Sequence, residues 1–399
     1  MPHALDAALP QPYSPPSLGS QCGSWQSHCY RVAALALALV IGGCATAPPP
    51  RGVDYPAPPV GAVKAPLPVA PAAPTRDWRA AGAGLDAAYE RSTLLTETFY
   101  SNADALLKQV EKSGAMGVNR GWEAGAAKGG DWYIEEQRFA DTVIGAGVNR
   151  NRDDLIDAGL RAIEWGFARQ AADGSFPCKD NYLSTSYFIA ATAHAMWLLE
   201  TTGAGQPFSA RVQAIRPRLQ NAAAWLADAK NAQAAAAQQD IHSSRYMVTG
   251  YALAATARLS GDTALASAGE DTIRRGLTRQ HASGYFSERG GFDASFQAEA
   301  LVYLLRYFDH AATADMRRSS EPALRLALDW LESRVSPRGI VQVAGNTRTG
   351  AGQERDRTGL ARRISAVAVS RAFGLARTVL GASKFEGLAK AVATARQPG

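Results

Sequence analysis

Two kinds of helical segment alternate along most of this chain, and the alternation limits the folds open to it. From Trp78 onward, apolar residues recur every three to four positions and are interrupted at Gly, Pro and Asn. One kind of segment is polar at its start and then apolar all round, as in a buried helix, whereas the other has a charged face, as in an outer helix. The first kind covers residues 89–107, 135–147, 184–200, 243–259, 294–308 and 362–380, and the second covers 153–170, 215–230, 264–280, 322–334 and 385–394.

Alternation of this kind predicts a ring of buried helices surrounded by half-exposed ones. The starts of the buried segments recur every roughly 50 to 70 residues, a spacing typical of helical repeats. We therefore predict an all-α fold, an (α/α)6-type toroid, as one domain over residues 76–399 that is long enough to bury a sizeable core without disulfides. An open solenoid with capping repeats at its ends is the alternative.

The first residues of the chain have a different pattern. Residues 32–43 form an apolar run that is too short to span a bilayer and fits the core of a signal peptide. The run ends in Gly43-Cys44, and this ending resembles the lipobox of bacterial lipoproteins. The resemblance implies a lipoprotein signal peptide over residues 1–43, lipidation of the Cys44 thiol and attachment to a membrane. The alternative is a buried apolar helix with an incidental cysteine.

A proline-rich segment follows the predicted lipidation site. Residues 45–75 contain ten prolines among Ala, Val and Gly, a composition that stays extended and acts as a spacer. We interpret residues 44–75 as the lipidated cysteine and a linker that holds the toroid away from the membrane. In lipoproteins that stay in the inner membrane, an Asp directly follows the lipidated cysteine. This chain has Ala45 there and so resembles the other group, which implies an outer-membrane lipoprotein that faces the periplasm or the cell surface.

Composition argues against several classes of function. Cys178 is the one cysteine that follows Cys44, so the mature chain has no internal disulfide and no zinc site made of cysteines. The six histidines are scattered without metal-ligand spacing, and no P-loop or dinucleotide fingerprint is present, so we expect no metal and no cofactor. The net charge of +6 suits an acidic partner such as a polyanionic glycan. The chain has no basic run with interleaved aromatic residues, so we expect no nucleic-acid partner.

Two turns repeat one motif. Gln170 is followed by Asp173-Gly174 and then Phe176, and a second copy runs from Gln280 to Gly284 and Phe286. Gly supplies the turn after an outer helix, and the aromatic residue is expected to pack back on that helix. The motif resembles the Gln-x-x-Asp-Gly-x-Trp/Phe repeat of terpenoid-cyclase-like toroids. The acidic cluster with which those cyclases protonate terpenes is missing, so the resemblance implies the fold and not the activity.

The polar starts of the buried helices are the candidate sites for chemistry, because in toroids of this kind they face a common cleft. The segment from Asp240 to Tyr246 places His242, Arg245 and Tyr246 within about one helical turn. A base, a cation and a phenol are the groups that β-elimination of a uronate polysaccharide needs: the cation neutralises the carboxylate, the base takes the C5 proton, and the phenol protonates the leaving oxygen.

This segment resembles the Asn-Asn-His-x-Tyr-Trp helix start of toroid alginate lyases, with Asp240 and Ile241 in place of the two Asn. The resemblance implies a polysaccharide lyase that acts on an acidic, uronate-containing substrate. Within it, His242, Tyr246 and Tyr187 are the predicted acid and base groups, and Arg245 and Asn181 the predicted carboxylate binders. Further predicted substrate-binding residues are Asp293 and Gln297, which would orient the substrate, together with Tyr285 and Glu288 from the preceding loop.

Three alternatives remain open from the sequence. A glycoside hydrolase would need two carboxylates across the scissile bond. A non-catalytic glycan-binding lipoprotein would use the same cleft. The residues around His242 are also compatible with an ordinary capped helix start. The candidate carboxylates for hydrolysis are Asp131, Glu135, Glu136, Asp180, Asp240, Glu288 and Asp293.

Overall fold

The computed structural model describes residues 84–123, 131–350, 353–356 and 359–397. The predicted signal peptide, the lipidation site at Cys44 and the proline-rich linker lie outside these residues. None of the helices in the described part is long and apolar enough to cross a membrane.

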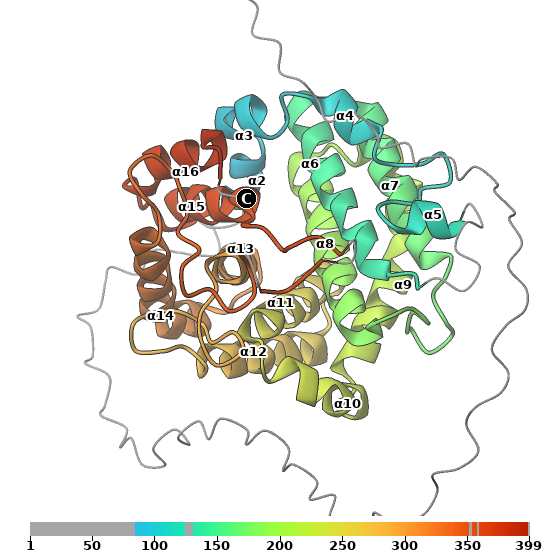
Figure 1. Ribbon diagram of the computed structural model, residues 1–399. Helices are drawn as coiled ribbons and strands as arrows, with labels where there is room; N and C mark the ends of the chain where they lie inside the picture. Colours follow the sequence, from blue (N-terminus) through green and yellow to red (C-terminus); the bar gives the residue numbers. More distant parts are fainter. Residues whose placement is uncertain (1–83, 124–130, 351–352, 357–358, 398–399) are drawn as a thin grey trace, which may run out of the picture. The chain divides into compact units, whose positions relative to one another are not determined.

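Six inner segments form a closed ring within the described residues. Each inner segment contacts the next one along the chain, and the last contacts the short first one, which contacts the second (Figure 1). The inner segments are α2 (Leu85–Glu90), α6 (Ala140–Arg150), α8 (Asn181–Thr202), α11 (Ser243–Ser260), α13 (Ala294–His310) and α15 (Ala366–Leu380).

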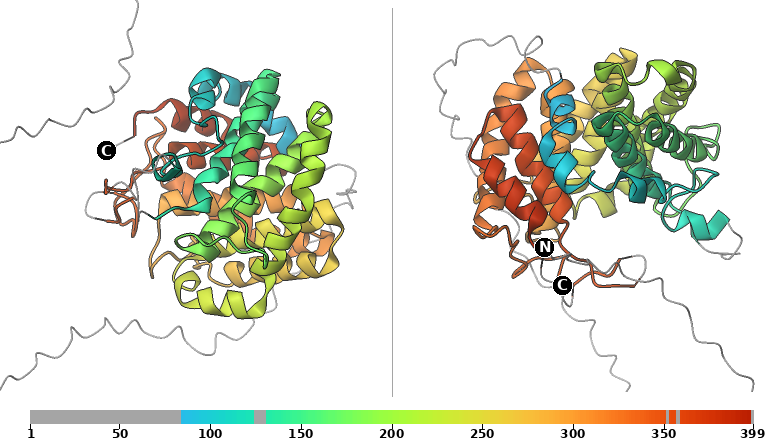
Figure 2. Two further views of the ribbon diagram at one scale, coloured as in Figure 1. Left: turned by 90° about the vertical axis from the view of Figure 1, so that its right-hand side faces the viewer. Right: turned by 90° about the horizontal axis from the view of Figure 1, so that it is seen from above.

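Outer helices surround this ring, and each packs on the inner helix that precedes it (Figure 2). They are α7 (Asp153–Phe167), α9 (Ser209–Ala227), α12 (Thr263–Leu277), α14 (Ala314–Ser333) and α16 (Phe385–Thr394). The described residues contain isolated β-bridges but no strand. The predicted all-α toroid of inner and outer helices is therefore confirmed.

Some helix boundaries differ from the predicted ones. The segment predicted as one helix over 89–107 is broken into α2, α3 (Thr93–Thr98) and α4 (Ala103–Leu107). The side chains of Ser92 and Asn102 cause the breaks, because each accepts a hydrogen bond from a backbone N–H three residues later and so begins a new helix. The helix predicted from residue 362 begins at Ala366.

Two further helices were not predicted, α5 (Asn119–Glu123) and α10 (Ala229–Gln239). The segment predicted over 135–147 begins as the 3₁₀ helix η1 (Ile134–Phe139) and continues as α6. Helix α10 begins where Asp228 accepts hydrogen bonds from the backbone N–H groups of Lys230 and Asn231. A second 3₁₀ turn, η2 (Gln206–Phe208), leads into α9.

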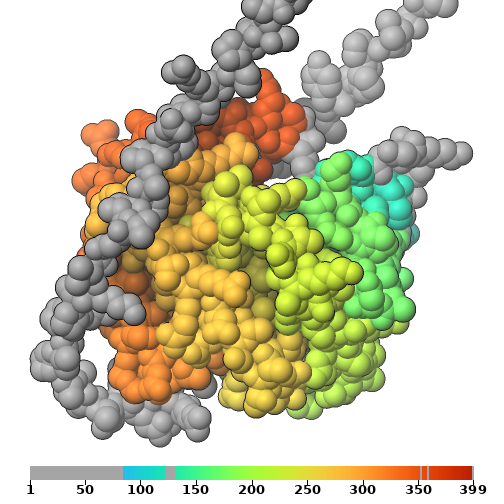
Figure 3. All heavy atoms as spheres, turned by 90° about the horizontal axis from the view of Figure 1, so that it is seen from below, coloured from blue at the N-terminus to red at the C-terminus, as the bar shows by residue number. Residues whose placement is uncertain are grey.

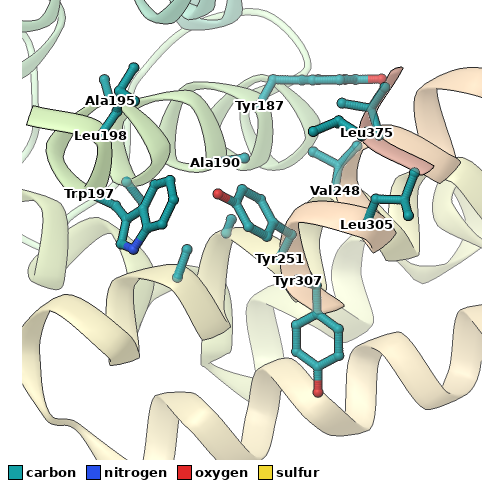
Figure 4. Packing of buried hydrophobic residues seen from close by; sticks show 14 of the residues in the cluster. Tyr187, Ala190, Ala195, Trp197, Leu198, Val248, Tyr251, Leu305, Tyr307 and Leu375 are labelled. Atoms are coloured by element: carbon teal, nitrogen blue, oxygen red, sulfur yellow. The ribbon is translucent and has the colours of Figure 1, made fainter. Parts of the chain in front are cut away.

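Helix α8 shows how the apolar inner helices make the core. Every residue from Ser184 to Leu199 is buried, as its nearly continuous apolar sequence predicts. Figure 4 shows Trp197 of α8 beside Tyr251 of α11, with Leu305 of α13 nearby. An inner helix thus has neighbours on all sides, so a polar side chain in its middle must find its partners inside the protein.

Each repeated turn leads from an outer helix to the next inner helix and packs against the following outer helix. Gly174 and Gly284 have φ values of +93° and +108°, and a Cβ on either would lie 2.4 Å from a backbone carbonyl oxygen of the following outer helix. The preceding glutamine fixes each turn: the Gln170 Nε2 donates to the Gly174 carbonyl and the Gln280 Nε2 to the Gly284 carbonyl, at 3.2 and 3.0 Å. Phe176 is fully buried against Phe167 of the preceding outer helix, so the predicted structural role of this motif is confirmed.

The segment between α14 and α15 runs across the end of the ring at which α13 begins, and it is the orange to red chain that crosses the middle of Figure 1. The Thr347 N–H donates to the Phe292 carbonyl at 3.0 Å, and the Ser365 N–H donates to Ser295 Oγ at 2.9 Å. These two hydrogen bonds hold the segment between α14 and α15 against the start of α13, although the bonded residues are distant in the sequence.

Candidate functional site

The loop before α13 pairs with the start of α11 and brings two predicted residues together. Ser243 N–H donates to the Ser287 carbonyl at 3.0 Å, and Arg289 N–H donates to the Ile241 carbonyl at 2.7 Å. His242 is the residue that precedes α11, in extended conformation, and its backbone pairs with Glu288. The polar ends of two neighbouring inner helices therefore meet in one place.

His242 and Glu288 form a buried dyad there. The Nδ1 atom of His242 lies 3.0 Å from Oε2 of Glu288, and the other carboxylate oxygen accepts the Ser244 N–H at 2.8 Å. Burial lowers the pKa of His242, and the hydrogen bond with Glu288 opposes this only in part. Within the described residues the second ring nitrogen, Nε2, has no hydrogen-bond partner. The dyad therefore offers a neutral, oriented imidazole that can accept a proton.

Arg348, from the segment that crosses the ring, holds the same carboxylate. Its Nη1 donates to Glu288 Oε2 at 2.9 Å, and its Nε donates to Glu354 at 3.1 Å. The guanidinium lies 3.4 Å from the ring centroid of Phe296. These three contacts fix Arg348, so its main effect is to keep Glu288 ionised and in place.

Arg245 is the half-buried cation beside the dyad. Its Nη1 donates to the Gln238 carbonyl at 2.9 Å, and it forms no ion pair within the part of the chain that the structure describes. Burial lowers the pKa of Arg245, and the nearby charge of Arg348 lowers it further. A guanidinium without a carboxylate partner next to a proton acceptor is suited to bind an anionic substrate group.

Tyr187 and Glu299 add two groups whose pKa values are raised by burial. Burial raises the pKa of Tyr187 well above its ordinary value, and the Glu299 charge contributes to the rise. Burial also raises the pKa of Glu299, against the lowering effect of Arg138, whose guanidinium lies 4.6 Å from the Tyr187 ring centroid. The charge of Tyr187 also acts on the pKa values of Arg245 and Arg348, so Tyr187 is near the dyad.

We call these residues the mouth cluster. It consists of Arg138, Tyr187, His242, Arg245, Glu288, Glu299 and Arg348. Sequence reasoning named four of them but missed Arg138, Glu299 and Arg348. The available signal for Glu299 was an acidic residue inside the otherwise apolar stretch 294–308.

Three other predicted residues lie elsewhere. The Tyr246 hydroxyl donates to Asp240, and the Arg279 guanidinium covers its ring at 5.1 Å, so its side chain points away from the dyad. Tyr285 stacks on His281 at 4.5 Å and contacts Trp330. Asn181 is the exposed first residue of α8.

Asp293 and Gln297 are occupied by backbone contacts. Asp293 caps α13, because Oδ1 accepts from the N–H of Ser295 and Oδ2 accepts from the N–H of Arg348 and Thr349. Gln297 accepts the Phe286 N–H at 2.8 Å and donates to the carbonyl oxygens of the turn at 284 and of residue 327. Both residues are buried, and they build the walls of the mouth cluster.

A second buried polar cluster lies deeper in the ring. His194 Nδ1 lies 2.5 Å from Asp141 and Nε2 lies 2.8 Å from Asp86, while Arg306 contacts the same two carboxylates. Burial and the Arg306 charge lower the pKa of His194, but the two carboxylates outweigh them and raise it to about 9. His194 is thus a satisfied core histidine, as its position among Ala and Met predicts.

Asp86, Glu90 and His194 lie close enough together to hold a metal ion. Both ring nitrogens of His194 already face carboxylates, however, and Arg306 approaches Glu90 to 3.3 Å. The positive charges of His194 and Arg306 oppose a cation at this position. We therefore interpret this cluster as a brace of the ring.

No family model matches this chain. No curated protein matches it significantly. Among solved structures, the chain is similar to the chondroitin AC lyase of Streptomyces coelicolor A3 in complex with chondroitin sulphate, at 15% sequence identity and a TM-score of 0.48. The match covers 77% of this chain and 42% of that chain, so the chain spans about two-fifths of the length of that lyase. A proposal for the function of this chain must therefore be argued from its own residues.

Proposed function

We propose that this chain cleaves an acidic, uronate-containing polysaccharide by β-elimination at the mouth cluster. One observation carries the proposal: a buried imidazole, His242, is oriented by Glu288 and lies next to Arg245, a cation that forms no ion pair within the described residues. A proton acceptor beside an anion-binding cation is the combination needed to remove a proton next to a carboxylate.

Each step of the reaction has a residue in this cluster. Arg245 binds the uronate carboxylate and stabilises the negative charge that develops as the C5 proton leaves. His242 Nε2 takes that proton. The C4–O bond then breaks, a double bond forms between C4 and C5, and the Tyr187 phenol gives its proton to the departing glycosidic oxygen. The sugar receives no water, and the proton from C5 remains on the imidazole until solvent removes it.

The other members of the cluster position these groups. Glu288 holds the imidazole through Nδ1, so that Nε2 is the nitrogen available to the substrate. Arg348 fixes Glu288 from the segment that crosses the ring. Glu299, whose charge raises the pKa of Tyr187 and whose own pKa burial raises, returns a proton to the phenolate.

Glycoside hydrolysis is the second candidate, and the environment of Glu299 favours it. A half-buried carboxyl group with a raised pKa can act as a general acid. Glu135, which pairs with Arg138 at 2.9 Å, would be the second carboxylate. Glu288 and Asp293 are less suited to that role, because their carboxylate oxygens are committed to Arg348 and to backbone N–H groups.

The test uses the full chain and a panel of uronate polymers, for example alginate, polygalacturonate and hyaluronan. An increase in ultraviolet absorbance from the unsaturated product supports the lyase, and it should be lost in His242→Gln. The matched control is His281→Gln, an exposed histidine that contacts Ser283 and Tyr285 away from the cluster. New reducing ends without that absorbance would support hydrolysis instead. Retention on the polymers without any product would support a glycan-binding protein.

We further propose that Cys44 anchors the toroid to the outer membrane through a lipid, with residues 45–75 as the spacer. The lipobox-like ending at Gly43-Cys44 and the ten prolines that follow it support this arrangement. Labelled palmitate should be incorporated into the chain in a bacterial host and not into Cys44→Ser. Equal labelling of both forms would contradict the proposal.

A further inference from the structure

A cavity of about 460 Å³ lies in the side wall of the ring, between α10 and the hairpin of α11 and α12. Its volume is within the range of roughly 300 to 1,000 Å³ that is typical of small-molecule sites. Figure 3 views the molecule from the side on which α10 and α12 lie, and the yellow-green and gold surfaces border a hollow there. We call it the lateral cavity.

The sequence of α10 explains why the space is not filled. Among the hairpins of the ring, an extra helix stands between an outer helix and the next inner helix only at α10, within the described residues. The side of α10 that faces the cavity presents mostly Ala229, Ala232 and Ala236, with Gln233 exposed beside them. The methyl groups of these alanines are too short to reach α11 and α12, so the space between α10 and that hairpin stays empty.

The side chain of Gln239 indicates which kind of ligand the cavity binds. Gln239 is 7% exposed and lines the cavity, yet its buried side-chain Oε1 has no hydrogen-bond partner within the described residues. Other polar groups of the lining are satisfied inside the protein: Thr249 donates to Ser186 Oγ at 2.9 Å, and Tyr182 donates to the Leu226 carbonyl at 3.0 Å. A buried amide oxygen left without a partner is costly, so a donor from outside the chain is expected.

The remaining lining resembles a site for a hydroxyl-rich ring. The rings of Tyr182 and Tyr246 provide apolar faces. Asp271 and Arg275, both exposed on α12 at the rim, form no hydrogen bond through their side chains and no ion pair within the described residues. Their opposite charges offer an acceptor and a donor without a net preference for an anion. An amide that gives one acceptor and one donor matches two neighbouring hydroxyl groups of a sugar.

We infer that the lateral cavity binds a neutral saccharide unit, with two vicinal hydroxyl groups paired to the Gln239 amide. This site lies outside the mouth cluster and does not depend on the reaction proposed there. It would hold a glycan on the side wall of the protein. The unpartnered amide oxygen and the alanine-lined cavity together carry the inference.

The test is saturation-transfer NMR of the full chain with the methyl glycosides of glucose, galactose and mannose in the millimolar range. At least one glycoside should receive saturation from the protein. The signal should disappear in Gln239→Met, which removes the amide, and in Ala236→Leu, which fills the cavity. It should persist in Gln238→Met, the exposed neighbouring residue on the same helix.

Thermal unfolding of the same variants distinguishes a ligand-binding amide from a structural one. Because the amide oxygen lacks a partner in the free protein, Gln239→Met should leave the unfolding midpoint unchanged or raise it. A clear fall of the midpoint in Gln239→Met would show that the amide braces the fold and would overturn the inference. Absence of any glycoside signal, or a signal that survives Gln239→Met, would overturn it as well.

Discussion

Glu288 holds His242 through one ring nitrogen: its Oε2 lies 3.0 Å from Nδ1, so the free ring nitrogen of the dyad is Nε2. The same carboxylate accepts from the Ser244 N–H and from Arg348, so its position is fixed by three donors. The dyad thus joins a loop, a helix start and the crossing segment, which are separated in the sequence by 40 or more residues.

The first prediction concerns the pH dependence of this dyad. The charge of Glu288 raises the pKa of His242, against burial, which lowers it. In Glu288→Gln the pKa of His242 should therefore fall further, and the acidic limb of the kcat/KM profile should move to lower pH. The plateau should drop by about 10²- to 10⁴-fold, the range for a misplaced general base. A profile with an unchanged acidic limb would contradict the assignment of His242 as the base.

The second prediction concerns stability in alkali. In the folded chain the pKa of His194 is raised to about 9, above the value of about 6.5 of an unfolded histidine. The protonated imidazole therefore stabilises the fold fully below pH of about 6.5, and this contribution is lost as the pH rises through 9. The loss should be on the order of 3 kcal/mol. Urea unfolding from pH 6 to 10 should show it, and His194→Gln should flatten the profile over this range.

A flat profile in the unmodified chain would contradict this role of His194. Because the carboxylates of Asp86 and Asp141 stay buried in His194→Gln, the variant should also be less stable than the unmodified chain at pH 6. A loss of packing alone would lower the stability equally at every pH, so a difference between the two chains that shrinks above pH 9 identifies the charged imidazole.

The fold was predictable from the sequence because a helix that is buried along its whole length needs apolar residues along its whole length. Residues 184–199 are apolar with few exceptions, and each of them is buried, so composition alone distinguishes α8 from the outer helices. The break of the stretch 89–107 was harder to predict, because it depends on the single capping side chains of Ser92 and Asn102. Helix α10 was missed because an alanine-rich segment has little amphipathic pattern.

The candidate site was predictable only in part, because it depends on which way side chains point. His242, Arg245 and Tyr246 lie within four residues of one another, but Tyr246 points away to Asp240. Glu288 was proposed as a substrate contact, and only the pairing of two loops reveals that it orients His242. Arg348 comes from the segment across the ring, and no local pattern connects it to α11.

The third prediction concerns the central brace. Arg306 is 3% exposed and contacts Asp86, Glu90 and Asp141, so Arg306→Met leaves buried carboxylates without their cation. Unfolding free energy should fall by about 3 to 5 kcal/mol. Arg318→Met is the matched control, since Arg318 pairs with Asp315 on the exposed face of α14 and should change stability by less than about 0.5 kcal/mol. Equal effects of the two variants would contradict the brace.

The fourth prediction concerns the repeated turn. In Gly284→Ala the new Cβ would lie 2.4 Å from the Leu326 carbonyl oxygen at a φ of +108°, so the turn must separate from α14. The cost should exceed about 2 kcal/mol. Gly261 also has a positive φ, +77°, but nothing lies within 4 Å of its Cβ position, so Gly261→Ala should cost only about 1 kcal/mol. Denaturant unfolding measures both, and a smaller effect at Gly284 would contradict the packing role of the turn.

The last prediction separates stability from function at Arg245. A half-buried guanidinium that forms no ion pair within the described residues gives little to the fold, and burial lowers its pKa. Arg245→Met should therefore leave the unfolding midpoint unchanged or raise it. If Arg245 neutralises the uronate carboxylate as the C5 proton leaves, the same change should lower kcat/KM by about 10²-fold or more. Arg325→Met, at an exposed ion pair of α14, should alter neither quantity. A variant of Arg245 that lost stability and kept kcat/KM would show instead that this cation serves the fold.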